Sequence, residues 1–486
     1  MRVRKDVTID LEKSGQRPVF LDIAASIVGD IERGRLKAGD ALPGTRTLAK
    51  SLKVHRNTVD AAFHELTMQG WLVTEPSRGT FVARDLPTAK PGGRNARLRI
   101  RPTSVDAGTV AGLLPPSLRV SDGAPNPRIM PRVELARAFR RALTGPTFLT
   151  DAGYGDPRGA PALRTALSGY LSRERGLAAS SADLMVTRGS QMGLFLAAAA
   201  IIEPGQAIAV ETPGYPLAWS AFRAAGARVI GVPVDAGGID IDHLARLAER
   251  EPGLRAIYVT PHHQYPTTVT MGAGRRLKLL DIARRHGLSV IEDDYDHEYR
   301  FDGRPVLPMA ARADQDTQVI YIGSLSKLLA PVVRLGYVVA RPDILTRMAD
   351  RREAIDRQGD LPLELALAAL IEDGELGRHA RKARRIYEAR RDVLADELRA
   401  SLGDDIAFDL PAGGLAIWMR LRSGLSAETW AANAARAGLV VSPGLRFALD
   451  AANAPEAFRI GYANFDDAEL RRLAALLRET RPTASP

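Results

Sequence analysis

Apolar positions near the start of the chain recur first with helical spacing and then with strand spacing. Five apolar residues share one face of a predicted helix over 19–33: Phe20, Ile23, Ala24, Ile27 and Ile31. Similar patterns predict helices over 45–52 and about 56–69, and short strands over 71–74 and 80–83. Turn residues over 75–79 separate the two strands. The predicted order is three helices followed by a hairpin.

The pattern changes from residue 121 onward, where short apolar runs alternate with amphipathic helices. The runs are 186–187, 207–210, 229–232, 256–260, 289–292 and 319–323. Strands separated by helices form a mostly parallel sheet covered on both faces, so we expect an α/β fold. Between the two patterns, Pro and Gly residues interrupt any apolar period and favour a flexible basic linker. The expected division is 1–84, 85–120 and 121–486.

Composition narrows the class of protein. The chain has 486 residues, 45% hydrophobic and 26% charged, which is long enough for two to four cores and excludes a disordered chain or a fibre. The longest apolar run, 194–202, is half the length of a membrane span, so no membrane partner is expected. Cysteine is absent, which excludes disulfides and thiolate chemistry and favours the cytoplasm.

The charge is unevenly distributed along the chain. Residues 1–120 hold 20 of the 67 Lys and Arg and 12 of the 57 Asp and Glu, a net charge of +8, and the remainder carries only +2 of the total of +10. A basic first quarter indicates a nucleic-acid partner for that part, although a solvated surface would have the same charge.

The third predicted helix begins with residues suited to DNA recognition. His55, Arg56, Asn57 and Thr58 can all donate hydrogen bonds, and Arg and Asn can read guanine and adenine in the major groove. Arg46 and the hairpin residue Arg78 could meet phosphates, and Gly79 permits a tight turn.

This part of the chain resembles the GntR family of bacterial regulators, whose DNA-binding unit is a winged helix-turn-helix. The resemblance rests on an ordered set of stretches over some 65 residues: Gly34-Arg-Leu-Lys-Ala-Gly39, Leu42-Pro43, Thr45-Arg-Thr-Leu-Ala49, Arg56-Asn-Thr-Val59, Glu65-Leu66, Gly70-Trp71 and Arg78-Gly-Thr-Phe-Val82. It implies binding to double-stranded operator DNA. His55 departs from the small polar residue that the family more often has there.

A second group of residues suggests cofactor chemistry. Lys327 follows the apolar run 319–323, at the strand end where ligands bind in open α/β sheets, and a lysine there can form a Schiff base. Arg334 offers a cation for a phosphate, and Asp293 could protonate a pyridine nitrogen. Each signal alone is weak, because such a lysine is usually solvated and the acidic cluster 293–296 could equally bind a divalent cation.

Together these residues resemble the fold type I, pyridoxal-phosphate-dependent aminotransferases. Further matching stretches are Tyr154-Gly-Asp-Pro-Arg-Gly159, Glu211-Thr-Pro-Gly-Tyr-Pro216, Thr260-Pro261, His263-Gln-Tyr-Pro-Thr267, Pro411-Ala-Gly-Gly414 and Phe458-Arg-Ile-Gly461. The resemblance covers about 121–475 and implies a smaller C-terminal α+β subdomain beside the main sheet.

The aminotransferase resemblance also implies roles for individual residues. Lys327 would bind pyridoxal 5'-phosphate as a Schiff base, Asp293 would pair with the pyridine nitrogen, Tyr295 with the ring hydroxyl, and Tyr215 would lie against the ring. Arg459 would bind the carboxylate of an amino-acid-like effector. The residues implied around the phosphate are Gly189, Ser190, Gln191, Ser324, Ser326 and Arg334, with Tyr154 reaching the neighbouring subunit of a homodimer.

Two positions depart from the aminotransferase pattern. Many members have Asn-Pro-Thr-Gly where this chain has Tyr265-Pro-Thr-Thr268. The Asn that touches the ring hydroxyl is therefore missing, which argues against efficient transamination. A Tyr at this point is familiar in the MocR subfamily of GntR regulators, which the whole chain resembles by joining both units.

The resemblance implies a dimeric transcriptional regulator whose aminotransferase-like domain binds pyridoxal phosphate. Either an amino-acid-like effector or pyridoxal phosphate itself would then change DNA binding. The alternative is a pyridoxal-phosphate-dependent amino acid aminotransferase with a vestigial DNA-binding domain, and weak transaminase activity is compatible with either interpretation.

Overall fold

A computed structural model describes residues 18–75, 78–86, 118–150, 153–301, 307–313 and 316–483. The chain divides into two compact units, Met1–Val110 and Ala111–Pro486. Most of the expected linker, 87–117, lies outside the described residues. Its last residues differ from the expectation, because Leu118–Arg119 form strand β3 and pair in parallel with β14 (Leu439–Val440).

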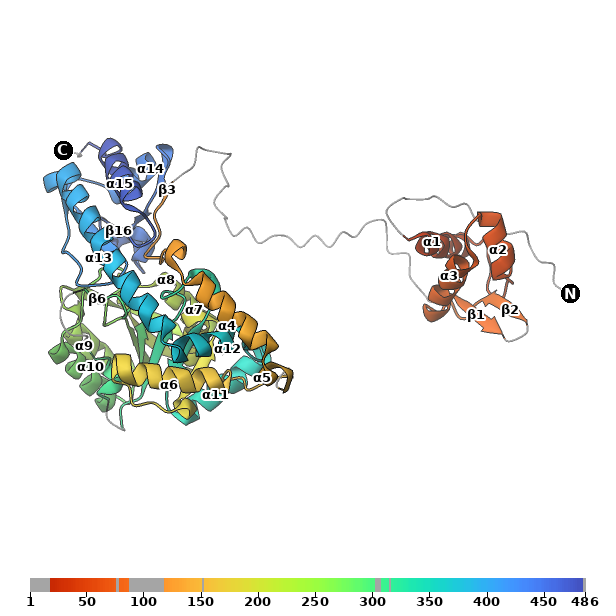
Figure 1. Ribbon diagram of the computed structural model, residues 1–486, viewed down its shortest axis with the longest axis horizontal. Coiled ribbons are helices and arrows are strands. Elements are labelled where there is room, and N and C mark those ends of the chain that lie inside the picture. Colours follow the sequence, from red (N-terminus) through yellow and green to blue (C-terminus); the bar gives the residue numbers. More distant parts are fainter. Residues whose placement is uncertain are drawn as a thin grey trace. The chain divides into compact units, whose positions relative to one another are not determined.

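The N-terminal unit contains the three helices and the hairpin that the sequence predicts (Figure 1). The elements are α1 (Val19–Glu32), α2 (Thr45–Leu52), α3 (Arg56–Met68), β1 (Leu72–Glu75) and β2 (Gly79–Val82). One apolar core joins them, with Ile23 and Ile27 from α1 packed with Val59 and Leu66 from α3. Lys53 adopts a left-handed conformation that ends α2 and starts the short turn to α3. The result is a winged helix-turn-helix.

The large unit is built on an eight-stranded sheet of order β4-β11-β10-β9-β8-β5-β6-β7. The strands are β4 (Leu184–Thr187), β5 (Ala207–Thr212), β6 (Arg228–Asp235), β7 (Gly238–Ile239), β8 (Leu254–Val259), β9 (Ser289–Asp294), β10 (Val319–Ser324) and β11 (Gly336–Val339). The run from β10 to β6 is parallel, whereas β11 and β7 pair antiparallel with their neighbours. The expected mostly parallel α/β sheet is confirmed.

Helices cover both faces of this sheet, as the unbroken apolar strands require. In β5, Ile208 and Val210 face a core with α7 (Gly189–Ile201), α8 (Pro216–Ala224) and α11 (Pro342–Ile355). The alternate residues Ala207 and Ala209 face α9 (Ile241–Arg250) and α10 (Ala273–Arg285) on the other side. Three further helices, α4 (Arg132–Thr144), α6 (Pro161–Arg175) and α12 (Leu361–Glu372), pack together, and α5 (Pro146–Thr150) follows α4.

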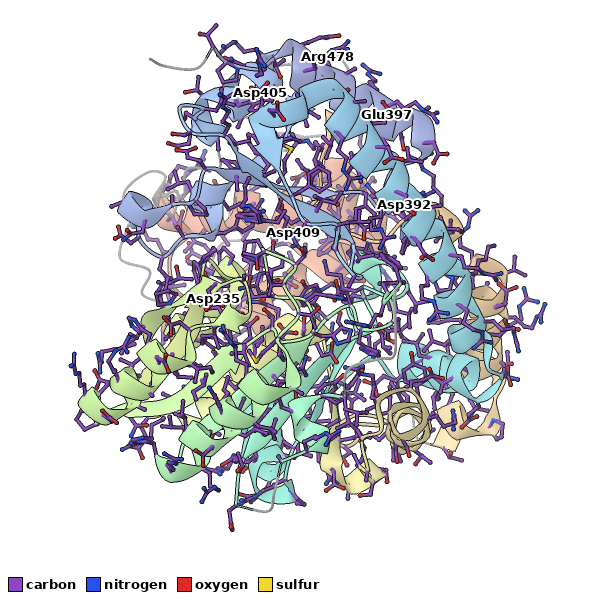
Figure 2. The ribbon with its side chains drawn as sticks, turned by 90° about the vertical axis from the view of Figure 1, so that its left-hand side faces the viewer. Asp235, Asp392, Glu397, Asp405, Asp409 and Arg478 are labelled. Atoms are coloured by element: carbon purple, nitrogen blue, oxygen red, sulfur yellow. The ribbon has the colours of Figure 1, made fainter. Side chains whose placement is uncertain are left out.

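A smaller C-terminal subdomain contains a four-stranded antiparallel sheet of order β12-β13-β16-β15. Its elements are α13 (Glu375–Leu402), β12 (Ile406–Ala407), β13 (Ala416–Leu421), α14 (Ala427–Arg436), β15 (Ser442–Pro443), β16 (Ala457–Gly461) and α15 (Asp467–Glu479). Glu397 on α13, labelled in Figure 2, pairs with Arg471 on α15 at 3.4 Å. The α+β subdomain that the resemblance implies is present.

The sequence predicts no membrane-spanning helix, and this prediction depends on the length and polarity of the helices. Within the part of the chain that the structure describes, no helix is both long and apolar enough to cross a bilayer.

Candidate functional site

A cavity of about 250 Å³ lies where the carboxyl ends of the parallel strands meet. Asp293 and Tyr295 reach it from the end of β9, Lys327 from the loop after β10, and Ser190 from the start of α7. Its other lining residues are Asp122, Ala124, Tyr215, Pro216, Leu217, Tyr258, Thr260, Tyr265 and Arg446. Five residues of the predicted site therefore share one cavity.

Lys327 has the properties of a Schiff-base lysine. Its Nζ atom donates a hydrogen bond to the backbone carbonyl of Gly123 at 2.8 Å. Burial, with a further contribution from the positive charge of Arg459, lowers the pKa of Lys327 to about 8. A lysine with this pKa is partly neutral near neutral pH, and the neutral amine is the form that attacks an aldehyde.

Asp293 is placed to bind a protonated ring nitrogen. Its Oδ2 atom accepts a hydrogen bond from the Tyr258 hydroxyl at 3.0 Å, and its buried Oδ1 atom has no partner among the described residues. Burial raises the pKa of Asp293 to about 7. An unpartnered buried carboxylate oxygen that borders a cavity is costly until a donor occupies it. A pyridinium N–H is such a donor, so this residue fits pyridoxal phosphate.

Tyrosines form an aromatic wall of the cavity. The rings of Tyr215 and Tyr265 meet edge to face with centroids 4.9 Å apart, and Tyr265 meets Tyr295 at 6.0 Å. Tyr295 lines the cavity, while its hydroxyl donates to the carbonyl of His263 at 2.8 Å. Burial raises the pKa of Tyr215 to about 12, so its hydroxyl stays protonated. The sequence predicted Tyr215 and Tyr295, but not Tyr258.

The residues predicted around a phosphate come from two parts of the chain, the start of α7 and the stretch 324–334. Gly189 has φ +75°, and the guanidinium of Arg334 packs 3.3 Å from where a Cβ would stand on it. Ser190 follows at the helix N-terminus, where free backbone N–H groups favour an anion. Ser326 follows the end of β10, and its hydroxyl accepts from the N–H of Leu335 at 3.2 Å. Ser324 ends β10 and is buried.

Of the six residues predicted around the phosphate, Ser190 alone lines the Lys327 cavity, whereas Gln191 and Arg334 line another. Both line a neighbouring cavity with Arg188, and Gln191 donates to the carbonyl of Leu217 at 2.6 Å. Arg334 donates to the carbonyl of Arg188 at 3.3 Å. Neither side chain borders the cavity that holds Lys327.

Arg459, the predicted carboxylate ligand, is only 1% exposed. It donates to the carbonyls of Asp122 at 2.9 Å and Pro266 at 2.6 Å, and its guanidinium lies 4.3 Å from the ring centroid of Tyr265. Arg446 instead borders the cavity and pairs with Asp122 at 3.0 Å. Sequence reasoning missed Arg446, since it stands in no recognised motif and most arginines are surface residues.

Tyr154 lies apart from the Lys327 cavity of its own chain. The residue is 79% exposed, and the guanidinium of Arg357 lies 4.0 Å from its ring centroid. It borders a different cavity with Gly155 and Gln358. A contact with the neighbouring subunit stays a prediction.

The carboxylates of the acidic cluster 293–296 each contact a different residue. Asp294 forms a buried ion pair with Arg175, and Asp296 lies 2.8 Å from the Nδ1 atom of His263. Among the described residues, no group of three or more His, Cys, Asp and Glu side chains could hold a metal ion. The divalent-cation alternative therefore has no support in the described residues.

Thr268 explains one departure from the aminotransferase pattern. Its φ is +65°, a left-handed conformation that favours glycine. A glycine at this position would adopt the same conformation without strain, whereas the threonine adopts it at a cost in strain.

The predicted DNA-binding residues lie at the start of α3 and on the hairpin. Arg46, Arg56 and Asn57 are exposed, and Thr58 is half-buried. His55 is the residue before α3, and its Nδ1 atom accepts from the N–H of Asn57 at 3.3 Å, so it caps the helix as a small polar residue would.

The hairpin presents a cation near its turn. The side chain of Arg78 is 73% exposed and pairs with Glu75, and the next residue, Gly79, has φ +116°. An exposed arginine on a wing can reach a DNA phosphate.

Comparisons with known proteins agree with both halves of this description. The model of the bacterial regulatory proteins, gntR family, matches residues 21–82, and that of aminotransferase class I and II matches 131–477. The chain is similar to the probable rhizopine catabolism regulatory protein MocR of Rhizobium meliloti, with 30% identity over 95% of this chain and 93% of that protein. It is 31% identical to the pyridoxine biosynthesis transcriptional regulator PdxR of Corynebacterium glutamicum, over 76% of each chain.

Solved aminotransferases share the fold of the large unit. LysN, an α-aminoadipate aminotransferase from Thermus thermophilus complexed with N-(5'-phosphopyridoxyl)-L-leucine, is similar with a TM-score of 0.69 and 27% identity over 76% of this chain and 92% of that one. The class I and II aminotransferase domain implies pyridoxal phosphate as cofactor, in agreement with Lys327 and Asp293. The chain therefore belongs to the GntR-family transcriptional regulators of the MocR kind, in which a winged helix-turn-helix is joined to an aminotransferase-like domain.

Proposed function

We propose that occupation of the Lys327 cavity changes DNA binding through the segment 121–124. The observation that carries this proposal is a set of contacts made by two consecutive residues. The carbonyl of Gly123 accepts from Lys327, and the carbonyl of Asp122 accepts from Arg459. The carboxylate of Asp122 also pairs with Arg446. One short segment thus engages three cations, of which Lys327 and Arg446 line the cavity.

This segment follows β3, which comes directly after 87–117 in the chain. When bound, pyridoxal phosphate supplies an aldehyde that combines with amines and a ring that withdraws electrons. A covalent bond at the Nζ atom of Lys327 removes N–H hydrogens and moves the side chain toward the cofactor, so it weakens the hydrogen bond to the carbonyl of Gly123. The Nε atom of Arg459 donates to the carbonyl of Asp122. This hydrogen bond must break before the Nε side of the guanidinium can bind an effector carboxylate. Ligand binding therefore competes with the contacts of 121–124, and this competition supplies the differential affinity that a switch requires.

The effector is either an amino-acid-like molecule or pyridoxal phosphate itself. The working form is a homodimer in the cytoplasm, with Tyr154 of each chain directed to the partner's phosphate site. The side chain of Tyr154 is 79% exposed, which leaves it accessible to a second subunit.

Fluorescence anisotropy with DNA from upstream of the gene tests the proposal. Affinity is measured for cofactor-free protein, for protein with pyridoxal phosphate, and for the latter with a panel of amino acids. If DNA affinity changes on adding pyridoxal phosphate alone, the cofactor is the effector. If the affinity changes only when an amino acid is also added, the effector is an amino acid. Lys327→Ala should abolish the response, whereas Lys278→Ala, an exposed lysine on α10, should retain it. A full response in Lys327→Ala would refute the proposal.

Transamination is the second candidate, and the lowered pKa of Lys327 favours it, because such a lysine can also transfer protons. Steady turnover of an amino and a keto acid, without an effect of either on DNA affinity, would identify this activity as the main one.

A further inference from the structure

A second cavity, of about 170 Å³, shares no lining residue with the Lys327 cavity. Tyr170, Glu174 and Arg175 of α6 form one wall, and α13 forms another. The remaining lining residues are His297, Glu298, Arg300, Gly377, Ala380, Arg381 and Arg384. The volume is below the roughly 300–1,000 Å³ of pockets for drug-sized ligands, so it suits a molecule of few atoms.

The floor of this cavity contains a buried carboxylate with an open position. The side chain of Glu298 is 4% exposed, and its Oε1 atom accepts from the Tyr170 hydroxyl at 3.2 Å and lies 3.0 Å from Nε2 of His297. Its Oε2 atom is buried and has no hydrogen-bond partner among the described residues. A buried carboxylate oxygen without a donor is costly, and a ligand cation would satisfy it.

The α13 wall carries the opposite charge. Arg381 and Arg384 are exposed and three residues apart, so they share one face of the helix. In the described part of the chain, neither forms an ion pair. Arg175, by contrast, is neutralised by Asp294. Two unpaired guanidinium groups beside a small cavity favour a carboxylate.

We infer that this cavity binds a small zwitterion, with its ammonium group on Glu298 and its carboxylate on Arg381 and Arg384. A simple anion would meet the open oxygen of Glu298, and a simple cation would meet the two arginines. Only a ligand with both charges, such as a free amino acid, satisfies both ends.

The site is distinct from the cofactor site although the two are close along the chain. Asp293 borders the Lys327 cavity, and the next residue, Asp294, pairs with Arg175 on the wall of the second cavity. Successive side chains of β9 point to opposite faces of the sheet, so the two cavities lie on opposite sides of this strand.

Calorimetric titration of the full-length Lys327→Ala protein with glycine tests the inference, because this variant lacks the Schiff-base lysine of the first site. Glycine should bind, and both acetate and methylammonium should bind at least tenfold more weakly. In this background Glu298→Gln and Arg384→Gln should each weaken glycine binding at least tenfold.

Arg385→Gln is the matched control, since Arg385 is exposed on α13 but does not border the cavity. It should leave the glycine affinity unchanged. Absence of glycine binding, equal binding of acetate, or equal affinities of Arg384→Gln and Arg385→Gln would each overturn the inference. Arg384 is a surface residue, so its variant remains informative if Glu298→Gln fails to fold.

Discussion

Lys327 and Gly123 are 204 positions apart in the chain, yet the Nζ atom of one donates to the backbone carbonyl of the other at 2.8 Å. Gly123 also has φ +97°, and a Cβ there would lie 3.3 Å from the Cβ of Leu415 and 3.5 Å from Nη2 of Arg459. The hydrogen bond to Lys327 thus depends on a backbone conformation and a close approach that glycine permits.

Replacing Gly123 with Ala should therefore disturb the segment 121–124. The positive φ and the short approaches should lower the free energy of unfolding by about 1–3 kcal/mol. The difference in operator affinity between cofactor-free and cofactor-bound protein should also shrink. The reason is that the carbonyl of residue 123 would be displaced and would no longer accept the hydrogen bond from Lys327 in the cofactor-free protein. Denaturant unfolding and fluorescence anisotropy measure the two effects.

Gly272→Ala is the control for this substitution. Gly272 has φ −67°, and no atom lies within 4 Å of a Cβ placed on it. Gly272 is the N-cap residue of α10, so its variant should lose no more than about 1 kcal/mol of stability and should keep the full affinity difference. An undiminished difference in Gly123→Ala would show that the signal takes another route.

Local pattern predicted the elements well because each depends on neighbouring residues. The helix predicted over 45–52 matches α2, and the strand predicted over 289–292 is β9 with two further residues. Those two, Asp293 and Asp294, extend the strand although they are acidic, since Tyr258 and Arg175 from distant parts of the chain each bind one of their carboxylate oxygens. Periodicity cannot report a partner of that kind.

Among the site residues, too, those in local motifs were predictable and those that depend on distant contacts were not. Lys327 and Asp293 were predictable because each follows an apolar strand in a recognisable motif. The partners Gly123, Tyr258 and Arg446 were not, because only the fold brings them to the cavity. Arg459 was identified, but its carbonyl contacts and its place behind Tyr265 follow from packing alone.

Asp293→Asn should affect stability and cofactor affinity in opposite directions. Burial raises the pKa of Asp293 to about 7 in the cofactor-free protein, so the folded state holds this proton more tightly than the unfolded state. Stability from this group is complete below about pH 4 and is lost as pH rises through about 7. At pH 8 the cofactor-free variant should be more stable than wild type, by no more than about 4 kcal/mol, whereas it should bind pyridoxal phosphate more weakly.

Denaturant unfolding at pH 5 and pH 8 tests this prediction. At pH 5 folded wild-type Asp293 is mostly protonated but the unfolded residue is mostly ionised, so the stability difference should fall to about 1.5 kcal/mol, less than half of that at pH 8. Burial also raises the pKa values of Glu211 and Glu292 to about 7; both residues are present in each protein, and the charge of Asp293 is only a minor cause of the raised pKa of Glu211, so most of their contribution cancels in the comparison. An equal stability difference at the two pH values would contradict the assignment to Asp293.

The rate of cofactor capture should follow the charge of Lys327. Burial lowers the pKa of this lysine to about 8, compared with about 10.4 for an ordinary lysine, and only the neutral amine attacks an aldehyde. The second-order rate constant for pyridoxal phosphate binding to cofactor-free protein should rise with pH and reach half its maximum near pH 8. Stopped-flow absorbance measures it, and a midpoint near that of a free lysine would refute the assignment.

Two arginines of the N-terminal unit should affect DNA binding in different ways. Arg56 is exposed at the start of α3 and lies 3.4 Å from Asp60, a contact that orients its guanidinium along the helix. If Arg56 contacts a base edge, Arg56→Ala should weaken binding to the operator by about 1–3 kcal/mol, roughly 5- to 150-fold. It should weaken binding to unrelated DNA much less. Arg78, on the hairpin, is expected to contact a phosphate, so Arg78→Ala should weaken all sequences by a similar factor.

Salt titrations separate the two roles. Loss of one phosphate contact lowers the slope of log affinity against log salt by about 0.9, so Arg78→Ala should lower it by about 0.9 for each bound subunit of the dimer. Arg56→Ala should keep a slope closer to that of wild type while its ratio of operator to unrelated affinity falls. Arg223→Ala removes the same charge from an exposed position on α8 of the other unit and should match wild type in both measurements. If Arg56→Ala weakened operator and unrelated DNA equally, α3 would not be the element that reads the sequence.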